Sequence, residues 1–182
     1  ERVLYNGFLS GVSLDGRKFF YVNPLETNPG TSGTIFGYKH VLPTRPGWYA
    51  CACCPPNLVR LVTSLGTYAW SESDTTLYSH LFLGQTADFE KAVVKVDSSY
   101  PWEGKVTYQV KAKMKDAFEL AIHIPSHIRM DTLCVTVNGE KTDAASCIKD
   151  GYLYLKQNWG ENDVIELTFD LPVRKIYANT NV

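Results

Sequence analysis

Residues 105–113 read Lys-Val-Thr-Tyr-Gln-Val-Lys-Ala-Lys, and this stretch decides the fold class. Val106, Tyr108, Val110 and Ala112 alternate with polar or charged side chains. An apolar residue at every second position is typical of a β-strand that buries one face and exposes the other. The stretch therefore predicts a half-buried strand.

Similar patterns lie on both sides of this stretch. The turn dipeptide Asn138-Gly139 follows an apolar run and predicts a tight hairpin. Several short strands with regular turns and little helix are typical of an antiparallel β-sandwich, so we expect a mainly β fold. The further strands are expected at residues 67–70, 76–83, 118–124, 133–137, 152–155 and 164–169.

The organisation is different before residue 67. We expect a helix tail over residues 1–10, one strand at Phe19–Val22, and then a loop over residues 23–48 that is rich in Gly, Pro and Thr. A loop of this length is often functional, although a plain surface connection is an equally good interpretation. The sequence therefore predicts two domains, residues 1–66 and residues 67–182.

Composition excludes several classes of protein. Of the 182 residues 45% are hydrophobic and 20% charged, which is typical of a globular chain. The net charge of −1 argues against a surface for nucleic acid or anionic membranes, and no apolar run is long enough to span a bilayer. Five cysteines, an odd number, do not suggest a disulfide framework. A cytoplasmic and a periplasmic location both stay open.

Three of those cysteines lie together in the segment Tyr-Ala-Cys-Ala-Cys-Cys-Pro-Pro-Asn-Leu, residues 49–58. A thiolate is both a nucleophile and a soft metal ligand. Pro55 favours an extended conformation for the residue before it, Cys54. The apolar spacing that follows predicts a short amphipathic helix that ends near Gly66. The cysteines are thus expected just before a helix N-terminus, where negative charge is stabilised.

Other interpretations of the cluster stay open. Cysteine is often only a small buried apolar residue. A disulfide between Cys53 and Cys54 is disfavoured, because adjacent residues would close a strained ring. A closed zinc site needs four ligands, so distant residues or another part of the protein would have to complete it.

The segment Cys-Ala-Cys-Cys-Pro-Pro-Asn resembles the signature of the β-L-arabinofuranosidases of glycoside hydrolase family 127, which are zinc-dependent and use a cysteine nucleophile. Residues 1–7 and 14–26 are similar to the stretch that closes the α/α barrel of that family. Later segments are similar to its following β-sandwich, namely residues 120–126, 137–139, 151–159 and 170–174. The chain thus resembles the tail end of the barrel followed by the sandwich.

The resemblance implies a role for particular residues. Cys53 would be the nucleophile of a retaining hydrolase that acts on a β-L-arabinofuranosyl saccharide, and Cys53 and Cys54 would both ligate zinc. Tyr21 would contact the sugar, and Cys51 is assigned to packing. The acid/base glutamate of the family and a Glu-x-Cys pair of ligands lie upstream of the matched part, and this chain has no Glu-x-Cys. We therefore expect the isolated chain to lack a complete active site.

Two rival classes have no catalysis: a carbohydrate-binding sandwich whose tryptophans stack on sugars, and a purely structural domain. Core packing is the expectation for Trp70 and Trp159. An open sheet edge is expected to favour a homodimer. The other polar candidates are expected to be packed or solvated and not ligands: His40, His80, His123, His127, Glu26, Glu72 and Glu103.

Overall fold

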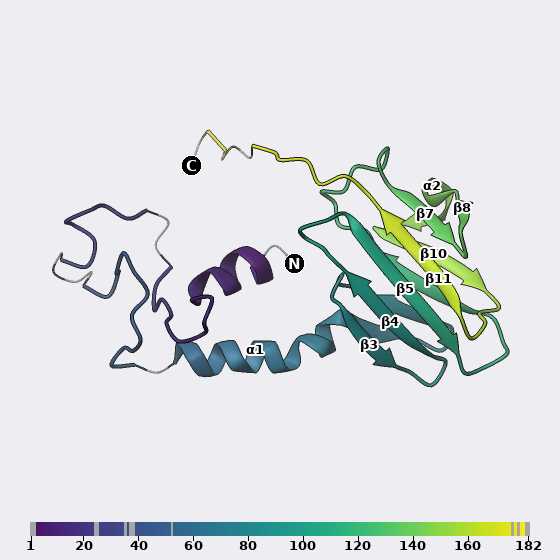
Figure 1. Ribbon diagram of the computed structural model, residues 1–182, viewed down its shortest axis with the longest axis horizontal. Coiled ribbons are helices and arrows are strands. Elements are labelled where there is room, and N and C mark those ends of the chain that lie inside the picture. The colour runs from purple at the N-terminus through teal and green to yellow at the C-terminus, as the bar shows by residue number, and fades with distance from the viewer. Residues whose placement is uncertain are drawn as a thin grey trace. The chain divides into compact units, whose positions relative to one another are not determined.

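The computed structural model describes residues 3–23, 26–34, 36, 39–51, 53–175, 177 and 179–180. It forms two compact units, Glu1–Gly66 and Thr67–Val182, and Figure 1 labels several of their elements. Glu1, Arg2, Pro24 and Leu25, which contribute to the family resemblance, lie outside the described residues.

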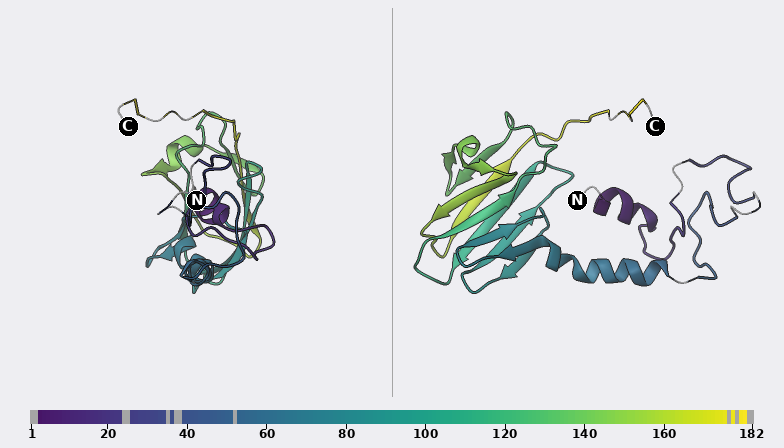
Figure 2. Two further views of the ribbon diagram at one scale, coloured as in Figure 1. Left: turned by 90° about the vertical axis from the view of Figure 1, so that its left-hand side faces the viewer. Right: turned by 180° about the vertical axis from the view of Figure 1, so that it is seen from behind.

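The second unit is a sandwich of two β-sheets, and the expectation of a mainly β fold is confirmed (Figure 2). One sheet has the strand order β1-β2-β6-β10-β9, and the other has the order β3-β4-β5-β11-β7-β8. All pairings are antiparallel except that of β2 with β6, which is parallel. The strands are β1 (Trp70–Glu72), β2 (Thr76–Ser79), β3 (Gln85–Asp88), β4 (Ala92–Ser98), β5 (Lys105–Ala112), β6 (Phe118–His123), β7 (Cys134–Val137), β8 (Glu140–Thr142), β9 (Ile148–Lys149), β10 (Tyr152–Gln157) and β11 (Asp163–Thr168).

Strand β5 behaves as its alternation predicts. Val106, Tyr108 and Val110 are buried, while Lys105 and Gln109 are exposed. The strand lies between β4 and β11, so its inner face meets the other sheet across the core. The side chains that fill this core come from both sheets, for example Leu77, Leu120, Ile122, Leu153, Ile165 and Leu167.

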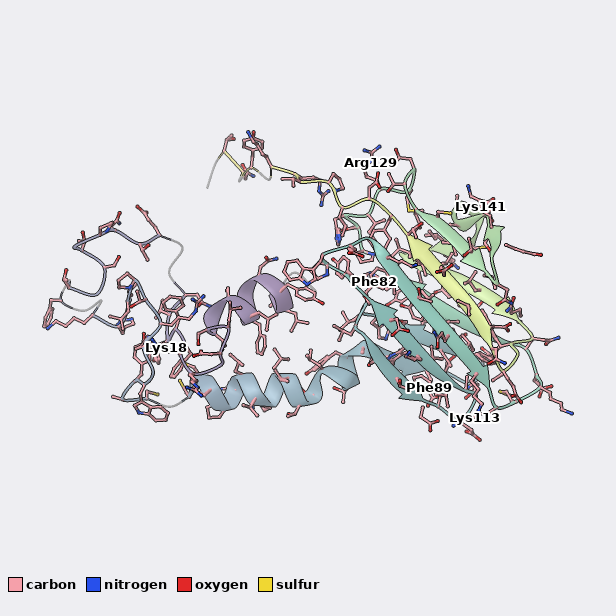
Figure 3. All side chains as sticks on the ribbon, viewed as in Figure 1. Lys18, Phe82, Phe89, Lys113, Arg129 and Lys141 are labelled. Atoms are coloured by element: carbon pink, nitrogen blue, oxygen red, sulfur yellow. The ribbon has the colours of Figure 1, made fainter. Side chains whose placement is uncertain are left out.

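An aromatic cluster closes part of the same core. The ring of Phe82, labelled in Figure 3, is only 2% exposed and lies 5.6 Å from the ring of Tyr100 and 5.9 Å from that of Phe169. Phe169 directly follows β11, and Tyr100 lies between β4 and β5. The cluster therefore joins segments that are distant in sequence.

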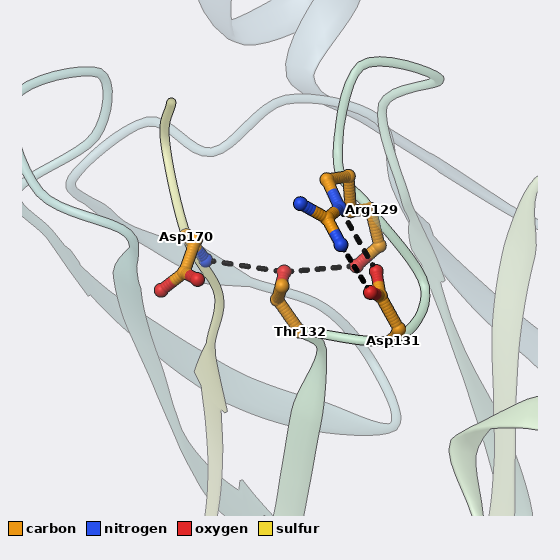
Figure 4. A network of polar contacts seen from close by, with 4 residues as sticks. All are labelled: Arg129, Asp131, Thr132 and Asp170. Atoms are coloured by element: carbon orange, nitrogen blue, oxygen red, sulfur yellow. Dashed lines mark hydrogen bonds and ion pairs between the residues drawn. The ribbon is translucent and has the colours of Figure 1, made fainter. Parts of the chain in front are cut away.

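A polar network ties a loop to the segment after β11 (Figure 4). The hydroxyl of Thr132 donates to the carbonyl of Arg129 at 2.9 Å and accepts from the N–H of Asp170 at 3.3 Å. Arg129 also forms an ion pair with Asp131. These contacts hold the loop before β7 against residue 170.

The predicted hairpin is confirmed. Asn138 and Gly139 have φ angles of 54° and 83°, which are the positive values that a tight two-residue turn requires. The turn joins β7 to β8, and the pairing of these two strands begins next to the turn with Val137 opposite Glu140.

Several predicted boundaries are wrong. The strand expected at Phe19–Val22 is only one isolated bridge between Val12 and Phe19. The segment expected as a strand from Thr67 is helical up to Ala69, because the helix α1 (Cys54–Ala69) continues past Gly66. Strand β4, which pairs with β5 over seven residues, was not expected, although Ala92, Val94 and Val96 alternate with less buried residues.

The first unit contains η1 (Val3–Phe8), η2 (Leu9–Gly11) and α1 up to Gly66. Of its described large apolar side chains, only that of Phe19 is buried. Others are open to solvent, including Val59 and Val62 on α1, Trp48 before it, and Val3, Leu9, Leu14 and Phe36. The described residues of this unit, taken alone, therefore leave apolar side chains exposed. None of the described helices is long and apolar enough to cross a membrane.

Candidate active site

The site is built around the start of α1. The helix begins at Cys54, so the extended conformation expected for that residue is wrong. Pro55 and Pro56 occupy the first turn, where the N–H groups of a helix have no partner within it. Neither proline therefore removes a helical hydrogen bond, and the sequence places two cysteines at the helix entrance.

The two adjacent thiols lie close together and are reduced. Their Sγ atoms are 3.7 Å apart, too far for a disulfide, and both cysteines are free. Cys53 is exposed and Cys54 is half-buried. Cys51, which was assigned to packing, is also exposed, so that assignment is wrong.

The separation of the two sulfurs fits a single tetrahedral metal ion. Two thiolates that each lie about 2.3 Å from a tetrahedral zinc are about 3.8 Å from one another, close to the 3.7 Å between Cys53 and Cys54. Within the described ranges, however, no group of three or more His, Cys, Asp or Glu side chains is placed to hold a metal. The donor set therefore fits zinc as two of its four ligands.

An open cavity of about 330 Å³ is lined in part by the half-buried residue Cys54. Asn57, Leu58 and Leu61 of α1 line it with residues from two other segments, namely Gly7, Phe8, Gly11, Phe19, Phe20 and Asn23. The side chain of Asn23 donates to the carbonyl of Gly7 at 3.3 Å, which ties these segments together. The wall is mostly apolar, with two carboxamides as its polar groups.

Asn57 also contacts the cysteine pair directly. Its side-chain Nδ2 donates to the main-chain carbonyl of Cys53 at 2.8 Å, and Arg60 donates to its Oδ1. No role for Asn57 was predicted from the sequence. The sequence did contain a signal for such a role, because Asn57 comes directly after Cys-Cys-Pro-Pro and so lies one helical turn after Cys53.

Tyr21 lies in an aromatic group with residues of the long loop. Its ring centroid is 5.8 Å from that of His40 and 5.5 Å from that of Tyr49. Tyr21 is 42% exposed, so its hydroxyl-bearing ring is accessible. Its described ring contacts are with His40 and Tyr49 rather than with a cysteine, while its sequence neighbours Phe20 and Asn23 line the cavity beside Cys54.

The tryptophans divide as predicted in the sandwich. Trp70 and Trp159 are 8% and 5% exposed, and Nε1 of Trp159 donates to the carbonyl of Phe118 at 3.0 Å. Trp102 and Trp48 are exposed. The carboxylates Glu26, Glu72 and Glu103 are exposed, as expected.

Two histidines lie with tyrosines on the five-stranded sheet. Nδ1 of His80 is 2.7 Å from the hydroxyl of Tyr152, and its Nε2 is 2.8 Å from Oγ of Ser71. Burial, together with the nearby charge of His123, lowers the pKa of His80 below its ordinary value. Burial likewise raises the pKa of Tyr152. These residues are packed against one another.

Comparison with known proteins relates both units to one family. Residues 1–67 match the family model of the GH127 β-L-arabinofuranosidase catalytic domain. Residues 76–171 match that of the GH127 β-L-arabinofuranosidase middle domain.

Individual relatives agree with this match. The chain is 37% identical, over its whole length, to a non-reducing end β-L-arabinofuranosidase from Bifidobacterium longum subsp. longum, and spans 28% of that protein. It is 40% identical to a GH127 β-L-arabinofuranosidase from Geobacillus stearothermophilus T6 of known crystal structure, with a TM-score of 0.86 over 98% of this chain and 28% of the other. A second solved structure, a GH127 β-arabinofuranosidase, is 30% identical with a TM-score of 0.76, over 93% of this chain and 27% of the other.

Proposed function

This chain belongs to the β-L-arabinofuranosidase family GH127, and we propose on that premise that it is part of a retaining glycoside hydrolase with Cys53 as its nucleophile. The substrate of the whole protein is a saccharide with a β-linked L-arabinofuranosyl unit. The chain spans only about a quarter of the length of its relatives, so residues outside it complete the active site. The uncovered apolar side chains of the first unit are consistent with further protein around them.

One observation carries the proposal: the 3.7 Å separation of the Cys53 and Cys54 sulfurs at the entrance of α1. A cysteine that attacks carbon must be reachable, and Cys53 is exposed. A thiolate is the attacking form, and the dipole of α1 favours negative charge at the start of the helix.

The reaction follows from the position of Cys53. Its Sγ forms a bond to the anomeric carbon while the bond from that carbon to the departing oxygen breaks. The departing oxygen takes a proton from a carboxylic acid that this chain does not supply. Water then attacks the same carbon and gives a proton back to that carboxylate, the carbon–sulfur bond breaks, and the thiolate is restored. Two successive inversions at one carbon retain the configuration.

Zinc fits the proposed site through Cys53 and Cys54, with two further ligands from outside this chain. When bound, it would keep the sulfur as a thiolate without a separate base. Tyr21 is proposed to contact the sugar. Its ring is accessible, and its immediate neighbours Phe20 and Asn23 line the cavity next to Cys54.

The test is a search for the covalent intermediate in the full-length protein. An aryl β-L-arabinofuranoside with a good leaving group is mixed with the enzyme, the reaction is quenched with acid, and the digested peptides are analysed by mass spectrometry. We expect one pentosyl group on the peptide that contains Cys53, and none in the Cys53→Ala variant. Wild-type kinetics in Cys53→Ala would end the proposal.

The rival function, sugar binding by the sandwich without catalysis, is favoured by one observation. Trp102 is 86% exposed on the second unit, where an indole can stack on a sugar. Two results together would favour this rival. Saccharide affinity would be lost in Trp102→Ala and unchanged in Cys53→Ala, and the full-length protein would show no turnover. Turnover that depends on Cys53 would exclude it.

A further inference from the structure

The carbonyl of Cys53 accepts two hydrogen bonds from one residue. The main-chain N–H of Asn57 donates to it at 3.4 Å, which is the ordinary bond of a first helical turn. The side-chain Nδ2 of the same residue donates to it at 2.8 Å. The second bond is additional to the helix, and it is the shorter of the two.

This carbonyl belongs to the peptide group that joins Cys53 to Cys54. A peptide group is planar, so the direction of its carbonyl also fixes the plane that contains both flanking Cα atoms. The two side chains that carry the thiols leave from those Cα atoms. The two torsions that flank this peptide, ψ of Cys53 and φ of Cys54, set how the two side chains are oriented toward each other, so a change in either torsion alone would move one sulfur relative to the other.

The orientation of the Asn57 amide is itself fixed. Arg60 donates to Oδ1 of Asn57, and a guanidinium can only donate. Oδ1 must therefore face Arg60, which leaves Nδ2 to face the carbonyl of Cys53. Arg60 lies three residues further along α1, on the neighbouring part of the same helix face.

We infer that Asn57 is the positioning residue of the cysteine pair, and that Arg60 orients it. Through the Cys53–Cys54 peptide, Asn57 keeps the two sulfurs at the separation that one metal ion requires. It also directs the thiol of Cys53 toward the substrate. This inference rests on the proposed function and extends it to residues that contact neither metal nor sugar.

The competing explanation is that Asn57 merely stabilises the helix. Thr63 offers a matched control, because its Oγ1 donates to the carbonyl of Val59, also four residues back, at 3.0 Å. The hydroxyl of Thr63 also lies 3.1 Å from the carbonyl of Arg60, so Thr63→Val, like Asn57→Ala, removes side-chain bonding to a helix carbonyl. Only the hydrogen bond from the Asn57 side chain is accepted by a residue of the cysteine pair.

The experiment uses the full-length protein and three measurements: zinc affinity by competition with a chromogenic chelator, kcat and KM, and the thermal midpoint of the metal-free form. For Asn57→Ala we expect zinc affinity to fall by about 10-fold to 100-fold, the usual effect of losing a residue that orients a metal ligand. We expect kcat to fall with little change in KM. Asn57→Asp, which has the same shape but cannot donate to a carbonyl, should behave like Asn57→Ala.

Thr63→Val should keep wild-type zinc affinity and kcat, with a thermal midpoint similar to that of Asn57→Ala. Wild-type zinc affinity in Asn57→Ala, or an equal loss in Thr63→Val, would overturn the positioning role. Cys53→Ser separates the two proposals. If that variant is active, the proposed function is wrong, whereas an inactive Cys53→Ser beside a fully active Asn57→Ala overturns only the role of Asn57.

Discussion

The hydroxyl groups of Ser79 and Tyr108 lie 2.9 Å apart in the interior of the sandwich. Ser79 is on β2 of the five-stranded sheet and Tyr108 is on β5 of the six-stranded sheet. Both residues are at most 1% exposed. This hydrogen bond therefore joins the two sheets through a mostly apolar core.

Tyr108→Phe should destabilise the chain. The substitution removes a partner of the buried Ser79 hydroxyl, and an unpaired buried polar group costs about 1–3 kcal/mol. Ser79→Ala combined with Tyr108→Phe should cost less than the sum of the single changes, because the two groups are partners. Chemical denaturation of the 182-residue chain measures both effects. Tyr154→Phe, on a half-buried ring, is the control, and an equal loss there would contradict the prediction.

Gly104→Ala should be among the most damaging single changes in the sandwich. A Cβ atom at this position would lie 1.7 Å from the carbonyl oxygen of Phe169, which is main chain and cannot move aside easily. The N–H of Phe169 also donates to the carbonyl of Gly104 at 2.9 Å, so the two segments cannot separate without losing that bond. We expect a large fall in the thermal midpoint of the chain.

Gly160→Ala is the matched control for Gly104. Its nearest neighbour would be the carboxylate of Asp163 at 3.7 Å, an ordinary contact. A small effect is therefore expected there. Similar thermal midpoints for the two variants would contradict the steric argument.

His80 should make the stability of the sandwich depend on pH. Its pKa is lowered in the folded chain, first by burial and then by His123. Below the ordinary pKa of about 6.5, the unfolded chain binds a proton that the folded chain does not. Stability should therefore fall as the pH drops below that value, and level off once the folded form is also protonated.

The measurement is the difference in unfolding free energy between the wild-type chain and His80→Gln across this pH range. The variant should show a flatter profile. His40→Gln, which changes an exposed histidine of the other unit, is the control for the loss of a histidine elsewhere in the chain. If His80→Gln has the same pH dependence as the wild type, the assignment to His80 is wrong.

A homodimer through a sheet edge stays a prediction. The edge strands of the two sheets are β1, β9, β3 and β8, with lengths of three, two, four and three residues. They carry charged side chains such as Glu72, Asp88 and Lys149. Short, charged edges pair weakly. We expect self-association that appears only at high concentration, which light scattering after size-exclusion chromatography will measure; one fixed mass at all concentrations would argue against edge pairing.

The sequence predicted best the parts of the fold in which local pattern and tertiary packing agree. The alternation around Tyr108 and the turn at Asn138-Gly139 each determine structure over a few residues, and both are confirmed. The strand expected at Thr67 is wrong, because α1 continues through the weak stop at Gly66. The parallel pairing of β2 with β6 depends on residues more than 40 positions apart, so no local pattern could indicate it.

In the candidate site, too, the sequence predicted what local pattern determines and missed what depends on tertiary packing. Three cysteines within four residues were visible in the sequence, and the structure brings Cys53 and Cys54 within 3.7 Å. The bond from Asn57 to Cys53 was not predicted, because an asparagine in a helix usually has no such partner. The contact of Tyr21 with His40 could not be predicted either, because it depends on how a long loop folds back.

The isolated 182-residue chain should bind zinc weakly and should not hydrolyse a β-L-arabinofuranoside. It supplies two sulfurs, whereas a tetrahedral zinc site takes four ligands. Chelator competition on this chain should give a low affinity that decreases further in Cys54→Ser, while Cys134→Ser, a change in the sandwich, should have no effect. The full-length protein should bind zinc far more tightly and lose activity when a strong chelator removes it. Full turnover by the isolated chain would contradict this prediction. It would show that residues of this chain supply the remaining zinc ligands and the acid/base carboxyl.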